Sequence, residues 1–210
     1  MKGIFRLDGP FFKYGTILAD VIILTVLWFV CSLPLITVGV ATTALFYVAT
    51  KQTTEREGYV TSNFFRSFKE NFFQGLLVTV ILAVVGFVIF ESIRFSELVT
   101  DGREIILTLD YIAAFEVLIV TLYIFPLMSR FDMKTTELFR AAFFLANRHM
   151  VTTITCFALF AAVILLCRFI NPVFFVASIG LYAYISSFML MKVFRKYCPD
   201  IDVDEPEDLR

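Results

Sequence analysis

The sequence predicts an all-α fold, a polytopic bundle of transmembrane helices. Of its 210 residues, 59% are hydrophobic and 26 are Phe, and the mean hydropathy is +0.83. Ordinary soluble domains are nearer half apolar, so the expected surroundings are a lipid bilayer. The formal charge is −1, and the basic residues are scattered between apolar runs, which does not fit a nucleic-acid-binding surface.

Residues 16–50 form the stretch around which the chain is organised, and they carry one charge, Asp20. A membrane crossing needs roughly 20 apolar residues, so this run is too long for one crossing and suits two short ones, 16–33 and 35–50. Pro34 lacks a backbone donor and disfavours helix at the residue before it. The sequence therefore predicts a helical hairpin with its break at Pro34 and Gly39. The second helix would reach only about 24 Å, which leaves open a full crossing or a re-entrant segment.

Four further crossings are expected, at residues 72–90, 105–128, 150–170 and 173–191. Together with the hairpin they give six membrane segments in a single domain, residues 1–196. Residues 197–210 are acidic and hold too little apolar surface to order themselves. We expect them to be a disordered tail.

Two amphipathic connectors separate the crossings, at residues 51–71 and 128–149. In the first, Phe64, Phe68 and Phe72 recur at four-residue spacing, which places them on one helix face. The second presents Phe139, Phe143 and Ala146 in the same way.

The distribution of Lys and Arg predicts the orientation. The N-terminal arm, both connectors and the tail hold 15 of these residues, whereas the other three connections hold 3. Basic residues concentrate on the cytoplasmic side of membrane proteins, so both termini and both connectors are expected in the cytoplasm. No cleavable signal is apparent, because the first apolar run passes directly into the second.

Glu116 is the sharpest candidate for a functional residue, because it lies about eleven residues into its predicted crossing, near the bilayer midplane. An ionisable group at that depth costs a few kcal/mol and marks a proton or ion site by default. The other reading is a protonated carboxyl, hydrogen-bonded to a Thr or Ser of a neighbouring helix, because burial raises a carboxyl pKa. The sequence leaves both readings open.

A helix-packing seam is expected in the third crossing. Gly75, Thr79, Ala83 and Gly86 fall on nearly one face, and small residues let another backbone approach closely. The breaks at Pro34 and at Asn171-Pro172 serve either as tight turns or as the broken helices that transporters use to bind substrate.

Signatures of enzymes are absent from the sequence. It has one histidine, His149, and no Gly-rich phosphate-binding loop. The cysteines show no metal-binding spacing and fit small apolar core residues or a free tail thiol, with a Cys31–Cys167 disulfide as the alternative; they are Cys31, Cys156, Cys167 and Cys198. We expect a protein that is not an enzyme and uses no cofactor or metal.

Several segments together resemble one known family. They are the run from Trp28 to Lys51, with SLPLIT at its centre, then Phe64, Phe68-Lys69 and Asn71-Phe72, and finally Phe125-Pro126-Leu127 with Arg130-Phe131. This pattern resembles the YesL-like family of small bacterial integral membrane proteins, over nearly the whole chain.

The resemblance implies a multi-pass protein of the bacterial cytoplasmic membrane, in a family with no agreed activity. Its genes often lie beside carbohydrate importers of the binding-cassette (ABC) type. The resemblance thus implies an accessory part in sugar uptake, with the permease subunits of a sugar ABC importer and the lipid bilayer as partners. It supplies no catalytic residues, and a homo-oligomer stays open. The alternative function is a small secondary transporter or channel that uses Glu116.

Overall fold

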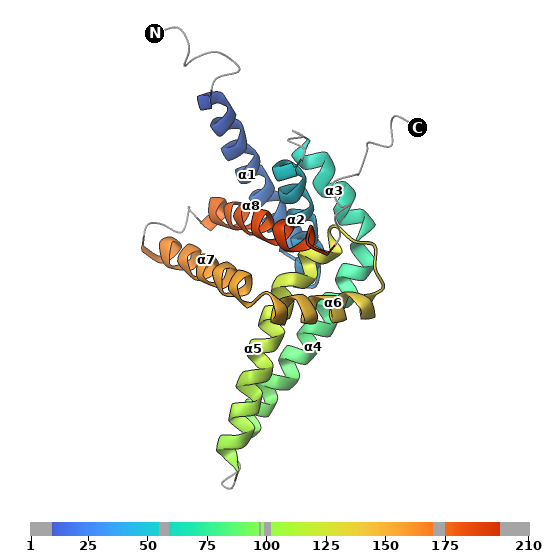
Figure 1. The fold of residues 1–210 in the computed structure, drawn as a ribbon, viewed down its shortest axis with the longest axis vertical. Helices are drawn as coiled ribbons and strands as arrows, with labels where there is room; N and C mark the ends of the chain where they lie inside the picture. Colours follow the sequence, from blue (N-terminus) through green and yellow to red (C-terminus); the bar gives the residue numbers. More distant parts are fainter. Residues whose placement is uncertain (1–9, 55–58, 97, 99–101, 170–174, 198–210) are drawn as a thin grey trace.

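The computed structural model describes residues 10–54, 59–96, 98, 102–169 and 175–197, and these fold into helices only (Figure 1). The elements are α1 (Pro10–Ser32), η1 (Leu35–Thr37), α2 (Val38–Thr54), α3 (Val60–Glu70), α4 (Phe72–Ser96), α5 (Arg103–Met128), α6 (Thr135–Arg148), α7 (Met150–Phe169) and α8 (Phe175–Phe194). The all-α prediction is confirmed for this part of the chain. Residues 198–210 of the predicted tail and the break at Asn171-Pro172 lie outside the described residues, whereas Tyr197, the first residue of that tail, is described.

The first two helices form a hairpin. α1 ends at Ser32, and the one-turn helix η1 separates it from α2. The Thr37 hydroxyl closes the turn, because it lies 2.6 Å from the carbonyl oxygen of Cys31 and 2.8 Å from that of Pro34. Trp28 donates to Thr42 at 3.1 Å, and Gln52 donates to Asp20 at 3.0 Å. The end of α1, at Trp28, thus pairs with the start of α2, and the earlier residue Asp20 pairs with the end of α2. The two helices are therefore antiparallel.

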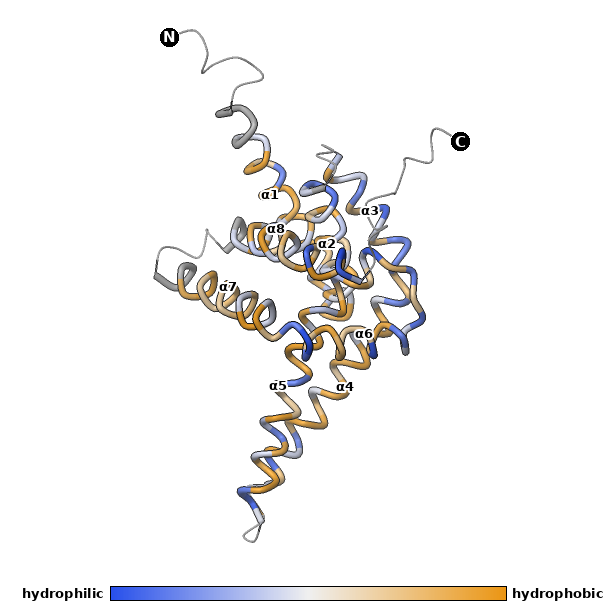
Figure 2. The backbone as a smooth tube through the Cα atoms, viewed as in Figure 1, coloured by the Kyte–Doolittle hydropathy of each residue, from blue (hydrophilic) through white to orange (hydrophobic). Residues whose placement is uncertain are grey.

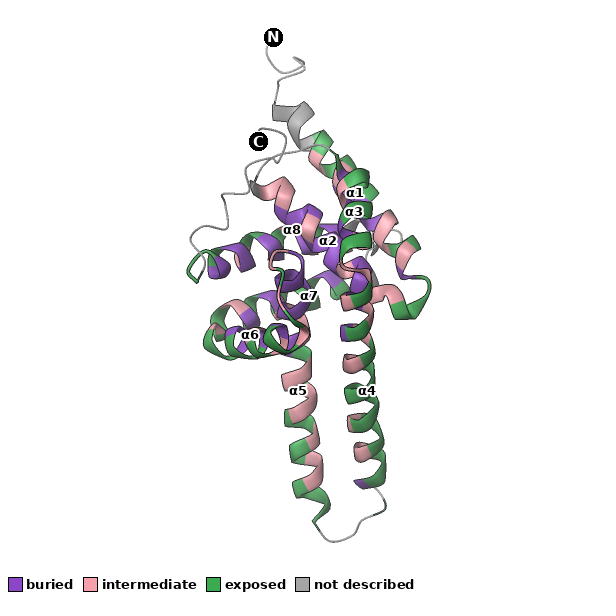
Figure 3. Cartoon of the chain, turned by 90° about the vertical axis from the view of Figure 1, so that its right-hand side faces the viewer, coloured by how far each residue is buried: buried purple, intermediate pink, exposed green. Residues whose placement is uncertain are grey.

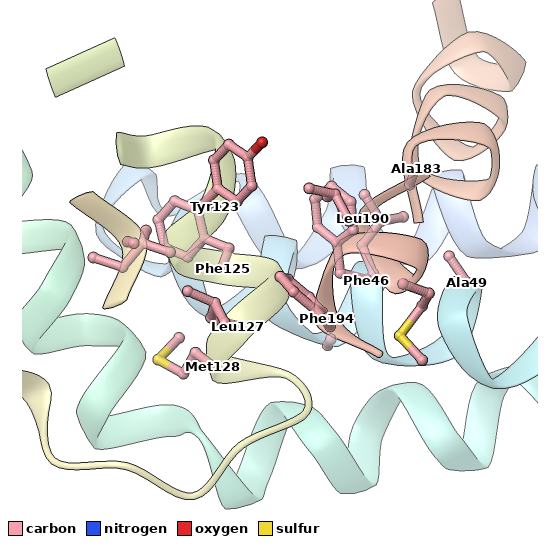
Figure 4. Packing of buried hydrophobic residues seen from close by; sticks show 14 of the residues in the cluster. Phe46, Ala49, Tyr123, Phe125, Leu127, Met128, Ala183, Leu190 and Phe194 are labelled. Carbon is pink, nitrogen blue, oxygen red and sulfur yellow. The ribbon is translucent and has the colours of Figure 1, made fainter. Parts of the chain in front are cut away.

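α2 is the central helix of the packed body. Val40, Ala41, Ala44 and Ala49 are fully buried, and α1, α3, α4, α5 and α8 all contact this helix. Figure 3 shows the burial concentrated around α2 and α8. Figure 4 shows part of the core at close range, with Phe46 and Ala49 of α2 and Leu190 of α8 among the residues of one buried cluster.

α4 and α5 form a second hairpin that projects from this body. Their outer halves are apolar and largely exposed (Figures 2 and 3). The sequence predicted that the third crossing would end near Phe90, but α4 continues to Ser96. Two contacts fall within this extension: Ser92 donates to Asp110 of α5 at 2.9 Å, and Arg94 lies 3.8 Å from Glu91.

Three described helices are long and apolar enough to cross a membrane, within Gly15–Ser32, Phe72–Ser96 and Arg103–Met128. The pair α6 and α7, bent by 91°, adds a fourth if it is counted as one broken span. α2 has 17 residues, and the described apolar part of α8 is Ser178–Phe194. The described residues thus contain three or four candidate spans, and the six spans that the sequence predicted are not confirmed. α1 and the α4–α5 hairpin leave the body in opposite directions (Figure 1).

Both amphipathic connectors are helical, and each buries a stripe against the protein. In α3, Phe64 is fully buried, and its ring stacks on Phe68 with centroids 6.2 Å apart. In α6 the buried residues are Leu138, Ala142, Leu145 and Ala146. Of the three residues that the sequence placed on one face, Ala146 is fully buried, Phe139 is partly buried and Phe143 is 54% exposed. The stripe that α6 buries therefore overlaps the predicted apolar face only in part.

The predicted seam on α4 packs along only half its length. A Cβ atom on Gly75 would lie 2.9 Å from Cγ2 and 3.1 Å from Cα of Val40, so α2 and α4 nearly touch there. Thr79 faces Gly39 at the start of α2. Ala83 and Gly86 are exposed, and nothing lies within 4 Å of a Cβ on Gly86.

The two ends of this seam predict opposite results for one substitution. Gly75→Leu must push α2 and α4 apart, because the new side chain would meet the backbone and the β-branched side chain of Val40. We expect the free energy of unfolding to fall by about 1–3 kcal/mol or more. Gly86→Leu adds a side chain to open space and removes a helix-weakening Gly, so it should be neutral or stabilising by up to about 1 kcal/mol. Thermal unfolding in detergent measures both variants. Equal losses would contradict the close contact of α2 and α4.

Candidate functional site

The corner between α6 and α7, residues 146–153, gathers polar side chains from several parts of the chain. α6 ends at Arg148, α7 begins at Met150, and the two axes differ by 91°. Such a bend at one residue leaves backbone carbonyls without their usual helical partners. Side chains of α5, of α7 and of the segment after α8 contact this corner.

Glu116 of α5 is held at this corner. Asn147, at the end of α6, donates from Nδ2 to Oε1 of Glu116 at 2.5 Å and also approaches the carbonyl oxygen of Phe143 at 3.1 Å. Glu116 lies where α5 leaves the packed body, because residues 119 and 120 are buried and most residues before 116 are not. Its partner is thus an amide on an amphipathic connector rather than a Thr or Ser of a crossing helix.

Tyr123 and Thr153 form a buried polar contact beside Glu116. The Tyr123 hydroxyl lies 3.0 Å from the Thr153 hydroxyl. Thr153 also lies 3.0 Å from the carbonyl oxygen of Ala146 and 3.1 Å from that of His149. The His149 carbonyl oxygen also accepts the backbone N–H of Thr153 at 3.0 Å. The Thr153 hydroxyl thus has one hydrogen for these carbonyls and an oxygen that can accept from Tyr123, and it ties the bend to α5.

His149 occupies the bend itself. Its Nε2 lies 2.9 Å from the hydroxyl of Tyr197, and the two rings meet edge to face with centroids 5.6 Å apart. Burial lowers the pKa of His149 below its ordinary value, and the positive charges of Lys196 and Arg148 lower this pKa further. The neutral imidazole is therefore the favoured form near pH 7.

Two other carboxylates in apolar helices are held in the same manner as Glu116. Asp20 of α1 accepts from Gln52 of α2 at 3.0 Å, and Asp110 of α5 accepts from Ser92 of α4 at 2.9 Å. In all three cases the donor is neutral and belongs to a neighbouring helix. An ionisable group in an apolar setting is costly unless it is hydrogen-bonded, so each pair also fixes one helix against the next.

Ser186, Cys31 and the hairpin break lie elsewhere in the structure. Ser186 is buried and donates to the carbonyl oxygen of Tyr182 in its own helix at 2.6 Å. Cys31 and Cys156 are free thiols, so the structure does not contain the alternative disulfide to Cys31. The side chains of Cys167 and Cys198 lie outside the described residues. Pro34 lies in the turn of the first hairpin, directly before η1, and Gly39 lies in the first turn of α2.

The sequence singled out Glu116 as a candidate site residue but not His149, and it gave the partner of neither. Asn147 is 31 residues from Glu116, and Tyr197 is 48 residues from His149. Helical periodicity reports neighbours three or four residues apart, so it carries no signal for such pairs. The only available hint was that Asn147 and His149 fall at the expected end of a connector.

These features define an α-helical integral membrane protein with three or four candidate spans. Residues 21–93, from α1 to α4, match a family model described as "Protein of unknown function, DUF624". The chain is also 32% identical over 136 residues to the uncharacterized protein YesL of Bacillus subtilis (strain 168). That alignment covers 61% of this chain and 63% of YesL. The two matches confirm the resemblance to the YesL-like family, whose function is unknown; no solved structure matches.

A double-mutant cycle tests the contact between α5 and α6. Glu116→Ala and Asn147→Ala should show a coupling of about 0.5–2 kcal/mol in the free energy of unfolding, because each change alone leaves the other polar group without its partner. Thr121 is the control, since it donates to Val117 in its own helix. Glu116→Ala and Thr121→Ala should add to within about 0.5 kcal/mol. Additivity in both cycles would contradict the Glu116–Asn147 contact.

The lowered pKa of His149 predicts a pH effect on stability. Below the ordinary His pKa of about 6.5, the unfolded chain binds this proton more readily than the folded chain, so stability falls as the pH falls. His149→Gln has no such proton. The thermal midpoint of the native protein, measured relative to that of His149→Gln, should therefore drop between about pH 7.5 and pH 5.5. A constant difference across this range would contradict the lowered pKa.

Proposed function

We propose that this protein is a non-enzymatic membrane accessory subunit that packs against another membrane protein through its α4–α5 hairpin. The observation that carries the proposal is the exposure of two long apolar helices beyond the packed body (Figures 2 and 3). Phe87 and Val88 of α4 are 62% and 60% exposed, and Leu109 and Ile112 of α5 are 60% exposed each. In a bilayer these faces meet lipid or another helix.

Small side chains favour a protein partner along part of α4. Ala83 and Gly86 are exposed on the outer half of the seam, about two and three turns beyond the point where Gly75 meets α2. In membranes, helices associate where small residues let their backbones come close. The inner half of the seam already makes such a contact within the chain, and the outer half offers the same surface to another helix.

The proposed partner is the permease of a carbohydrate importer of the ABC type. Support for this choice comes from the gene context that the YesL-like resemblance implies. YesL itself is described as uncharacterized, so its name adds no substrate.

The proposal includes the orientation derived from the charges. We place the protein in the bacterial cytoplasmic membrane with six membrane segments and with both termini and both connectors in the cytoplasm. Support comes from the 15 basic residues that fall on this side, against 3 on the other. Reporter tags at the two ends test it, and tags found on opposite sides of the membrane would overturn it.

Photo-crosslinking in cells tests the partner. A crosslinking amino acid at Phe87, 62% exposed on α4, should capture the permease, whereas one at Leu18, 58% exposed on α1, should not. Both positions are exposed and apolar to a similar degree. They differ in location, because Phe87 lies on the α4–α5 hairpin and Leu18 lies on α1. Crosslinks only to a second copy of the chain would replace the accessory role with a homo-oligomer.

Uptake by the purified protein separates this function from the alternative. In proteoliposomes the accessory subunit alone should transport no sugar and no ion. Transport by the protein alone that is lost in Glu116→Gln would establish a small secondary transporter or channel instead.

A further inference from the structure

A small apolar pocket lies where the ends of α5 and α8 meet α6. Its volume is about 150 Å³, and its walls include Phe131, Phe144, Leu145, Phe194 and Tyr197. A cavity of about this size lined by apolar side chains stays dry and accepts an apolar group about as large as benzene. The pocket therefore suits a short piece of hydrocarbon.

Aromatic contacts fix the walls of this pocket. Phe131 and Phe194 meet edge to face with ring centroids 5.8 Å apart, and Phe144 and Tyr197 do so at 6.2 Å. These edge-to-face arrangements are favoured between aromatic rings. Tyr197 is held further by its hydrogen bond to His149 at 2.9 Å, so the pocket keeps its shape without an occupant.

Positive charges lie at one side of the pocket. The guanidinium of Arg148 lies over the ring of Phe144, 5.6 Å from its centroid. Lys196 precedes Tyr197 in the chain, and both Lys196 and Arg148 are close enough to His149 to lower its pKa. Both cations are exposed.

The acidic side chains closest to the pocket in the chain line a different groove. Asp132 and Glu137 border this open groove, which shares Met133 with the apolar pocket. Glu116, at the corner, already accepts a hydrogen bond from α6. The cations, by contrast, lie beside the aromatic wall of the pocket at Phe144. This combination fits an amphiphile with a hydrocarbon chain and an anionic head.

We propose that the pocket binds an anionic phospholipid, with the phosphate against Arg148 and Lys196 and a few methylenes of one acyl chain in the pocket. Arg binds phosphate through parallel N–H donors, and basic pockets at the ends of membrane helices are typical sites for anionic head groups. The site is built from the last turn of α5, the segment that follows it, α6, and the end of α8 with the segment after it. It therefore uses neither the proposed partner nor the exposed outer half of the α4–α5 hairpin.

Native mass spectrometry of the full chain tests the head-group contact. The protein is purified in detergent that contains equal amounts of dioleoyl phosphatidylglycerol and dioleoyl phosphatidylcholine. The native chain should retain phosphatidylglycerol preferentially. Each Lys or Arg near an anionic lipid is worth about fivefold in binding, so Arg148→Gln with Lys196→Gln should lower this preference roughly 30-fold. Arg94→Gln is the matched control, because Arg94 also lies over a ring, 6.0 Å from Phe90, but far from the pocket along the chain. Equal retention of both lipids by the native chain, or an equal loss in the control, would overturn the proposal.

A second pair of variants tests the hydrocarbon contact. Ala141→Phe fills the pocket, of which Ala141 forms part of the wall, and should reduce retention of phosphatidylglycerol at least tenfold. Ala83→Phe adds the same ring to an exposed position on α4 and should leave retention unchanged. Full retention in Ala141→Phe would overturn the pocket as the lipid site. A mass of two chains with no lipid would assign the surface to a second copy and overturn the proposal as well.

Discussion

The close packing around α2 is the constraint on which the rest of the structure depends. Five helices contact this one segment, and there is room for them only because the facing side chains are small. A Cβ on Gly39 would lie 2.6 Å from the ring of Phe125, and one on Gly180 would lie 2.6 Å from the backbone oxygen of Val21. Thr25 accepts from the backbone N–H of Gly180 at 3.0 Å. Steric fit, more than any ion pair among the described residues, sets how α1, α4, α5 and α8 are arranged.

Carboxylates in apolar helices add a second level of organisation. Asp20, Asp110 and Glu116 each accept a hydrogen bond from a neutral group on a neighbouring helix. A neutral donor satisfies the oxygen without adding a second ion to the apolar region, which would carry its own desolvation cost. The three contacts fix α1 on α2, α4 on α5, and α5 on α6. These residues therefore have a structural role that needs no transported ion.

The sequence predicted the helices well and their packing poorly. Hydropathy and Pro34 located the helices of the described residues, because runs of apolar residues and helix breakers are local signals. The bounds were less exact: α1 begins at Pro10 and not at 16, and α4 ends at Ser96 and not near Phe90. Exposure was not predictable in the same way: the seam of Gly75 and Thr79 packs, whereas Ala83 and Gly86, which belong to the same periodic pattern, do not. Which half of the seam is covered depends on the position of α2 in the folded protein. The partners of Glu116 and His149 depend on the 91° bend between α6 and α7. The spacing of residues along one helix predicts neither the position of α2 nor this bend.

The central place of α2 has a consequence for how the chain is made. α2 is made before α3 to α7, yet α8, one of the helices that enclose it, follows all of them in the chain. Until α8 is made, the surface of α1 around Val21 and Thr25 also lacks its neighbour. Contacts that join distant parts of a chain form slowly, so the nascent protein must hold its first hairpin half-assembled while five further helices are added. Completion of the core therefore waits for the synthesis of α8.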